Sequence, residues 1–220
     1  MKKFVQLSLA IAAAAACSMA SAGVVTFEGN TNVYGNGESF NLGQQRLTVG
    51  EGGVIVNGSD PFSCTITACP VGNASNYYVG LNDGSLTLQT ERRAYLRSLD
   101  FGFVLPVDGL VGFSVGQLMV IADDGTTVSQ DFGLQNANGK YEFSNWNLGA
   151  FSNNHYSSFT FKACLYTEQG DCSSVSDLTM GQAQFAIDNI SYDIPEPASL
   201  ALVAASLGGM FFAGRRRKSV

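Results

Sequence analysis

Turn-forming dipeptides divide the central part of the chain into short segments. Asn-Gly or Asp-Gly occurs at residues 57–58, 83–84, 124–125 and 138–139. Such pairs favour the positive φ angles of two-residue hairpin turns, and the segments between them are apolar or alternate between apolar and polar residues. No long helical period is present. We therefore expect an all-β fold, an antiparallel β-sandwich of jelly-roll type.

The first 22 residues have the three parts of a secretory signal peptide. Two lysines at the start are followed by a mostly apolar run, and Ala20 and Ala22 then supply the small side chains that signal peptidase requires. We expect cleavage before Gly23, so that an exported domain occupies residues 23–194. The alternative is lipoprotein processing at Cys17, which follows two alanines.

The formal net charge of −6 conceals a strong segregation of charge. Six of the twelve Lys and Arg residues lie at the two chain ends, whereas only one of the eighteen acids lies outside residues 23–194. That region therefore carries a formal charge of −11. A strongly acidic domain lacks the basic surface that nucleic-acid binding requires, so we exclude that class of function.

The last 26 residues carry three features in a fixed order. Pro195, Glu196 and Pro197 precede an apolar run over residues 198–214, and a basic cluster follows: Arg215, Arg216, Arg217 and Lys218. A helix over the apolar run spans about 25 Å, slightly less than the ~30 Å hydrocarbon core of a bilayer. We expect a transmembrane helix whose basic end stays in the cytoplasm. A plain tail anchor is the alternative.

This order of features resembles the PEP-CTERM sorting signal of Gram-negative bacteria. The resemblance implies that an exosortase, a membrane-embedded cysteine transpeptidase-like enzyme, recognises residues 195–197 and cleaves near them, with residues 215–218 as the stop-transfer tail. It also implies an inner-membrane precursor that later reaches the cell surface or the medium. The two glycines at residues 208–209 resemble the glycine pair of a related signal that a rhomboid protease processes. They lie inside the apolar run rather than before it, however.

The resemblance extends loosely to the exported domain. Domains attached to such tails tend to open with a strand like residues 25–28 and to close with one like residues 185–192, and they look like carbohydrate-binding sandwiches. The family context implies a non-enzymatic role beside extracellular polysaccharide, in biofilm or floc formation. A carbohydrate-binding, lectin-like module is the alternative.

Four cysteines remain once the signal peptide is removed: Cys64, Cys69, Cys164 and Cys172. An even number in an exported protein predicts two disulfides, for which three connectivities are possible. Local pairing, Cys64 with Cys69 and Cys164 with Cys172, closes the smallest rings and is favoured. Metal binding is the competing interpretation, but the chain has no Cys-x-x-Cys pair.

The sequence offers little catalytic chemistry. His155 is the only histidine, lies in an Asn- and Ser-rich stretch, and is the only candidate base of a Ser-His-Asp triad. No Gly-x-Ser-x-Gly elbow is present. We expect no enzymatic activity. The remaining enzyme hypothesis is a polysaccharide-acting enzyme that uses two carboxylates across a cleft.

Two binding sites are conceivable. Glu28 and Asp188, on the opening and closing strands, would lie side by side if the chain ends pair, and carboxylates are ligands that a structural Ca²⁺ prefers. Otherwise each acid caps a strand at the surface. Trp146 and Tyr156 lie among Asn and Ser residues that suit sugar binding, although the only tryptophan of a sandwich more often belongs to its core.

Overall fold

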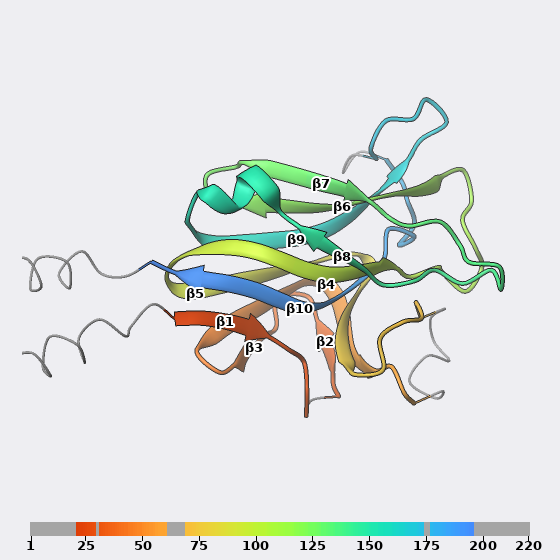
Figure 1. The fold of residues 1–220 in the computed structure, drawn as a ribbon. Coiled ribbons are helices and arrows are strands. Elements are labelled where there is room, and N and C mark those ends of the chain that lie inside the picture. Colours follow the sequence, from red (N-terminus) through yellow and green to blue (C-terminus); the bar gives the residue numbers. More distant parts are fainter. Residues whose placement is uncertain (1–20, 30, 61–68, 174–176, 196–220) are drawn as a thin grey trace, which may run out of the picture. The chain divides into compact units, whose positions relative to one another are not determined.

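The computed structural model describes residues 21–29, 31–60, 69–173 and 177–195 (Figure 1). Residues 23–193 form one compact unit. The body of the expected signal peptide and the expected transmembrane segment, residues 198–214, lie outside the described residues. Within the described ranges no helix is long and apolar enough to cross a membrane.

Ten strands and one short 3-10 helix make up the described part of the chain. The strands are β1 (Ser21–Val25), β2 (Val33–Gly35), β3 (Ser39–Leu42), β4 (Gln45–Asn57), β5 (Asn76–Phe103), β6 (Ser114–Ala122), β7 (Thr127–Asp131), β8 (Ser144–Asn147), β9 (Tyr156–Tyr166) and β10 (Phe185–Ile194). The helix is η1 (Gly149–Asn153). The expected all-β class is confirmed.

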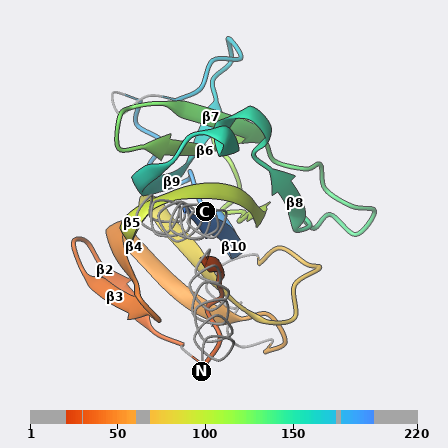
Figure 2. The same ribbon diagram turned by 60° about the vertical axis from the view of Figure 1, so that its left-hand side comes forward.

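The strands join into one sheet in the order β1-β10-β5-β9-β6-β7. Strands β2 and β3 pair antiparallel with β4, β4 pairs antiparallel with β5, and β8 adds to β5. Figure 2 shows β6, β7 and β9 on one side of β5 and β2 and β3 on the other. The long strand β5 therefore connects two groups of strands.

A wide bulge bends β4 and β5 together. Gly50 pairs with Ser85 and Gly52 with Leu81, so Glu51 alone faces the three residues 82–84. Glu51, Asn82 and Asp83 have positive φ angles of 63°, 56° and 61°. The sequence predicts a hairpin turn at residues 83–84, and this is wrong, because β5 continues through them. The bend lets one strand serve both groups of strands.

The side chain of Asp83 explains why the chain bends there instead of turning back. Its carboxylate accepts hydrogen bonds from the backbone N–H groups of Gly181 (3.0 Å) and Ala183 (2.9 Å). A side chain at Gly84 would place its Cβ 2.5 Å from the carbonyl oxygen of Leu81. The Asp-Gly pair thus anchors the segment that leads into β10.

Strand β10 lies between two parts of β5. Phe185 is the partner of both Gly80 and Phe103, and residue numbers rise along β10 while they fall along β5 on each side. Four of the largest fully buried side chains of the core belong to these two strands: Tyr77, Tyr78, Phe103 and Phe185. The beginning of β10 is therefore enclosed on both sides by β5.

One disulfide closes the connection after β9. Cys164 of β9 and Cys172 form a disulfide with their Cα atoms 5.6 Å apart, which is one of the two local pairings expected from the sequence. The turn between them is closed by the Thr167 N–H to Asp171 oxygen bond of 2.9 Å. Cys69 is also disulfide-bonded. Its expected partner, Cys64, lies outside the described residues.

Candidate functional site

The end of β10 is where the folded unit meets the Pro-Glu-Pro tripeptide. Tyr192 pairs with Leu96 and Asp193 with Tyr95, so strand pairing continues almost to Pro195. The Tyr192 hydroxyl accepts a 2.5 Å hydrogen bond from Nε2 of the buried Gln45. Strand pairing therefore holds the chain as far as Asp193, two residues before the tripeptide.

Strand β1 packs closely against this end. A Cβ added to Gly23 would lie 2.3 Å from the hydroxyl oxygen of Tyr192. Only glycine allows such an approach, because a larger side chain would overlap the tyrosine ring. Ala22 and Gly23, the expected signal-peptidase site, are both in β1. Ala20 lies outside the described residues.

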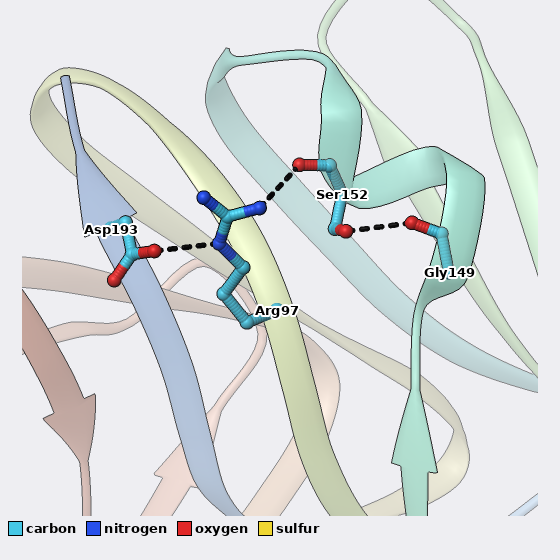
Figure 3. Close-up of polar contacts among 4 residues, drawn as sticks. All are labelled: Arg97, Gly149, Ser152 and Asp193. Carbon is cyan, nitrogen blue, oxygen red and sulfur yellow. Dashed lines mark hydrogen bonds and ion pairs between the residues drawn. The ribbon is translucent and has the colours of Figure 1, made fainter.

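Arg97 connects the end of β10 to the 3-10 helix, as Figure 3 shows. Its Nε donates to Oδ2 of Asp193 at 2.6 Å, and its Nη1 donates to the carbonyl oxygen of Ser152 at 2.9 Å. The Ser152 hydroxyl in turn donates to the Gly149 carbonyl at 2.6 Å. The guanidinium also lies 4.8 Å from the centre of the Tyr95 ring.

The energy of this ion pair is small, although its position is defined. The side chains of Arg97 and Asp193 are 40% and 39% exposed, and solvent screens a pair of that exposure to about 1 kcal/mol or less. Sequence reasoning did not single out either residue. The available signal was weak, since Arg97 is only one of six basic residues in residues 23–194.

Asp188, earlier in the same strand, is held differently. Only 1% of the residue is exposed, and its Oδ2 accepts hydrogen bonds from Asn73 Nδ2 (2.8 Å) and Ser75 Oγ (2.9 Å). Burial raises the pKa of this carboxyl group above its ordinary value. The alternative placement at the surface is therefore wrong for Asp188.

Glu28 lies near the same segment. It is exposed, and its Oε1 accepts a 3.3 Å hydrogen bond from the backbone N–H of Asn76. Strands β1 and β10 are neighbours in the sheet, so the chain ends do pair. Glu28 and Asp188, the two acids considered as calcium ligands, thus both contact residues 73–76.

The two aromatic residues considered for sugar binding belong to the core. Trp146 is 8% exposed and packs against Phe101, with ring centres 5.8 Å apart. Tyr156 is 3% exposed and stacks on Phe151 at 5.1 Å. A sugar can stack only on an exposed ring face, so these two residues do not form the expected platform. His155 is exposed and lies beside Tyr95.

An open hollow of about 450 Å³ lies over the bulge of β4 and β5. Its lining is mostly polar and includes both signs of charge: Glu51, Asn82, Asp83, Ser85, Lys162 and Thr179. No group of three or more His, Cys, Asp or Glu side chains suited to a metal ion occurs within the described part of the chain. The polar lining of the hollow offers hydrogen bonds.

One known family model matches this chain, and the match begins at the end of β10. Residues 193–218 match the model of the PEP-CTERM protein-sorting motif. The match begins at Asp193, the residue that Arg97 holds, and includes Pro195, Glu196 and Pro197 and the basic cluster. No curated protein matches the chain. The chain thus carries a PEP-CTERM sorting motif directly after its folded unit.

Proposed function

We propose that this chain is an exported substrate of an exosortase, made with a signal peptide and held in the inner membrane by residues 198–214 until it is processed. The observation that carries the proposal is the sorting-motif match over residues 193–218, which starts where the compact unit ends at Asp193. The motif is a transport signal, and the unit before it is its cargo.

The chemistry of the motif suits a processing enzyme. Proline lacks a backbone N–H, and the residue before a proline is driven to extended conformations. Pro195 and Pro197 therefore favour an extended chain across Glu196, which is the form that proteases and transpeptidases bind. Residues 215–218 act as the stop-transfer tail, because clustered arginine and lysine remain on the cytoplasmic side.

The cargo is proposed to be non-enzymatic, a jelly-roll-like surface or matrix protein that works beside exopolysaccharide in a biofilm. The acidic charge of residues 23–194 and the disulfide between Cys164 and Cys172 both suit an extracellular location. After processing, the protein is expected at the cell surface or in the medium.

The sorting proposal is tested by replacing Pro195 and Glu196 with alanine and following product size and location by immunoblot. Loss of processing is expected, with accumulation of a larger, membrane-bound form. A matched control replaces Pro106 and Glu91 with alanine, which changes the same residue types away from the motif. A product of unchanged size and location in the Pro195→Ala/Glu196→Ala variant would overturn exosortase processing.

The lectin-like alternative has one observation in its favour, the polar hollow over the bulge. Hydroxyl groups of a sugar bind to side chains of the kind that line it, and Lys162 is its basic member. Retention on exopolysaccharide from the producing cells is expected to fall for Lys162→Gln, on β9, and to persist for Lys140→Gln, an exposed lysine between β7 and β8. Equal retention of both variants, or none by the unsubstituted chain, would remove the hollow as the binding site.

A further inference from the structure

The floor of the hollow over the bulge crosses three strands. Gly50 of β4 pairs with Ser85 of β5, and Ser85 pairs with Lys162 of β9, and all three residues line the hollow. Directly paired residues of antiparallel strands present their side chains on the same face. A Cβ at Gly50 would lie 2.4 Å from Oγ of Ser85. The absence of a side chain at Gly50 therefore leaves room for the Ser85 hydroxyl at the bottom of the hollow.

The segments that wall the hollow are held by the fold itself. Asp83 binds two backbone N–H groups of the segment 177–183, which contributes three lining residues. Ser173 exchanges hydrogen bonds with Leu165, since its N–H donates to the carbonyl oxygen at 2.7 Å and its Oγ accepts the N–H at 3.0 Å. The neighbouring Cys172 is joined to β9 by its disulfide. The hollow is thus formed before any ligand binds, which lowers the entropic cost of binding.

Thr179 supplies a buried hydroxyl group to the hollow. It lines the hollow although only 5% of the residue is exposed. Its hydroxyl forms no hydrogen bond with a described residue, yet solvent still reaches the oxygen atom. Nearly enclosed hydroxyl groups usually have a protein or water partner. The Thr179 hydroxyl therefore faces the hollow and is available to a ligand.

Four other side chains of the lining are available in the same way: Glu51, Asn82, Ser85 and Lys162. None of the four forms a side-chain hydrogen bond or ion pair with a described residue. The ammonium group of Lys162 only donates, the carboxylate of Glu51 only accepts, and the amide and hydroxyl groups do both. A ligand that fills the hollow must therefore donate and accept hydrogen bonds at several points.

The charges of the lining disfavour an ionic ligand. Glu51, Asp83 and Asp177 all line the hollow, and residues 23–194 carry a formal charge of −11, so an anion is repelled. A cation is repelled in turn by Lys162 in the floor. A hydroxyl group donates and accepts without carrying a charge.

We propose that this hollow binds an uncharged sugar unit, whose hydroxyl groups bond to Thr179, Ser85 and Lys162. The volume of about 450 Å³ lies within the range of about 300–1,000 Å³ that is usual for ligand pockets. The inference rests on the lectin-like function proposed above and narrows its ligand to uncharged saccharides. Acidic polysaccharides are then not the ligand.

The test uses the chain as purified from the producing cells. Exopolysaccharide from the same cells is separated by anion exchange into an uncharged and an acidic fraction, and dextran, galactan and mannan are added as uncharged probes. Calorimetry in 0.5 M NaCl is expected to show saturable binding to the uncharged fraction or to at least one of these polymers. The acidic fraction, polygalacturonate and the cationic polymer chitosan should not bind.

Four variants locate the site. Thr179→Val and Ser85→Ala should each weaken binding about two- to tenfold, the usual worth of one hydrogen bond, with Tm unchanged because neither hydroxyl has a partner in the chain. Glu51→Gln should bind within about twofold of the unsubstituted chain, since an uncharged ligand needs an acceptor there and not a charge. Thr31→Val removes an exposed hydroxyl outside the lining and is the control, which should bind fully.

The proposal is overturned if the unsubstituted chain binds none of the uncharged saccharides, or if Thr179→Val and Ser85→Ala bind as tightly as the control. Ser85→Ala alone decides if Thr179→Val does not fold. Loss of binding in Glu51→Gln would mean a cationic ligand and would also overturn it. Binding to the acidic fraction that is lost in Lys162→Gln would support the lectin-like function while it overturns this inference. None of these results depends on exosortase processing, which the immunoblot of the Pro195 and Glu196 variant tests separately.

Discussion

The two halves of β10 hold their acids in opposite ways. In the first half, Phe185 and its neighbours have β5 on both sides, and Asp188 is buried among neutral amide and hydroxyl groups. In the second half β10 pairs with the later part of β5, and Asp193 is partly exposed and paired with the cation Arg97. One strand thus passes from the core to a solvent-exposed junction within ten residues.

The difference separates two tasks of the strand. The first half holds the sheet together, and its acid is buried beside neutral hydrogen-bond donors. The second half leads in sequence to the sorting motif, and its acid is held by a screened surface ion pair. If this division is correct, substitutions of the buried side chains of the first half should cost much stability, and substitutions of the half-buried polar side chains of the second half, Ser191 and Asp193, should cost little.

The largest effect is expected for Phe185→Ala. The ring is fully buried, lies 6.1 Å from the Tyr78 ring, and fills the space that a side chain at Gly80 would occupy. Truncation of a buried Phe costs about 3–5 kcal/mol through lost burial and the cavity left behind. Urea unfolding of the purified chain measures this cost.

Ser191→Ala is the comparison in the second half, at a half-buried polar position. Ser191 is only half-buried, so its substitution should change the free energy of unfolding by less than about 0.5 kcal/mol. Similar costs for the two variants would mean that the halves of β10 are equally integrated into the fold.

Alkaline pH tests, without a mutation, how well the core beside the first half of β10 excludes water. Burial raises the pKa of Tyr77 from 10.0 to about 12 and that of Tyr78 further. Above pH 10 the unfolded chain loses these protons while the folded chain keeps them, so stability is complete below pH 10 and falls as pH rises. The loss for Tyr77 alone reaches about 2–3 kcal/mol near pH 12.

The measurement is urea unfolding across this pH window, together with tyrosinate absorbance. Tyr77→Phe should lose less stability than the unsubstituted chain between pH 10 and 12, since it has one buried phenol fewer. If all tyrosines ionise near pH 10 before the chain unfolds, water reaches the buried tyrosines of β5 that lie beside the first half of β10.

The sequence predicts the strands better than it predicts their connections. The Asp124–Gly125 pair forms the expected turn between β6 and β7, where the Asp124 side chain accepts the Thr126 N–H. The identical pair at 83–84 forms a bulge instead, because Asp83 binds backbone groups a hundred residues away. A local propensity for positive φ does not distinguish a turn from a bend, and only the tertiary contact decides.

The candidate site was predictable to a similar extent. The sorting motif is visible because it is a contiguous pattern with its own chemistry. The pairing of the chain ends was also expected, but Glu28 follows β1 instead of lying on the opening strand, and Glu28 and Asp188 contact different residues of the segment 73–76. Arg97 was not predictable, since its role depends on the register between β5 and β10. The burial of Trp146 likewise depends on contacts with Phe101 that its polar sequence neighbours conceal.

The smallest effect is expected at the second half of β10 and needs a double-mutant cycle of Arg97→Ala and Asp193→Ala. The coupling energy should be about 0.2–1 kcal/mol, because both side chains are about 40% exposed, and it should shrink in 1 M salt, where the screening length is about 3 Å. Arg92→Ala with Asp193→Ala is the control cycle and should show no coupling. A salt-independent coupling above about 2 kcal/mol would mean that the junction is as rigid as the core half, and the contrast between the two halves would then fail.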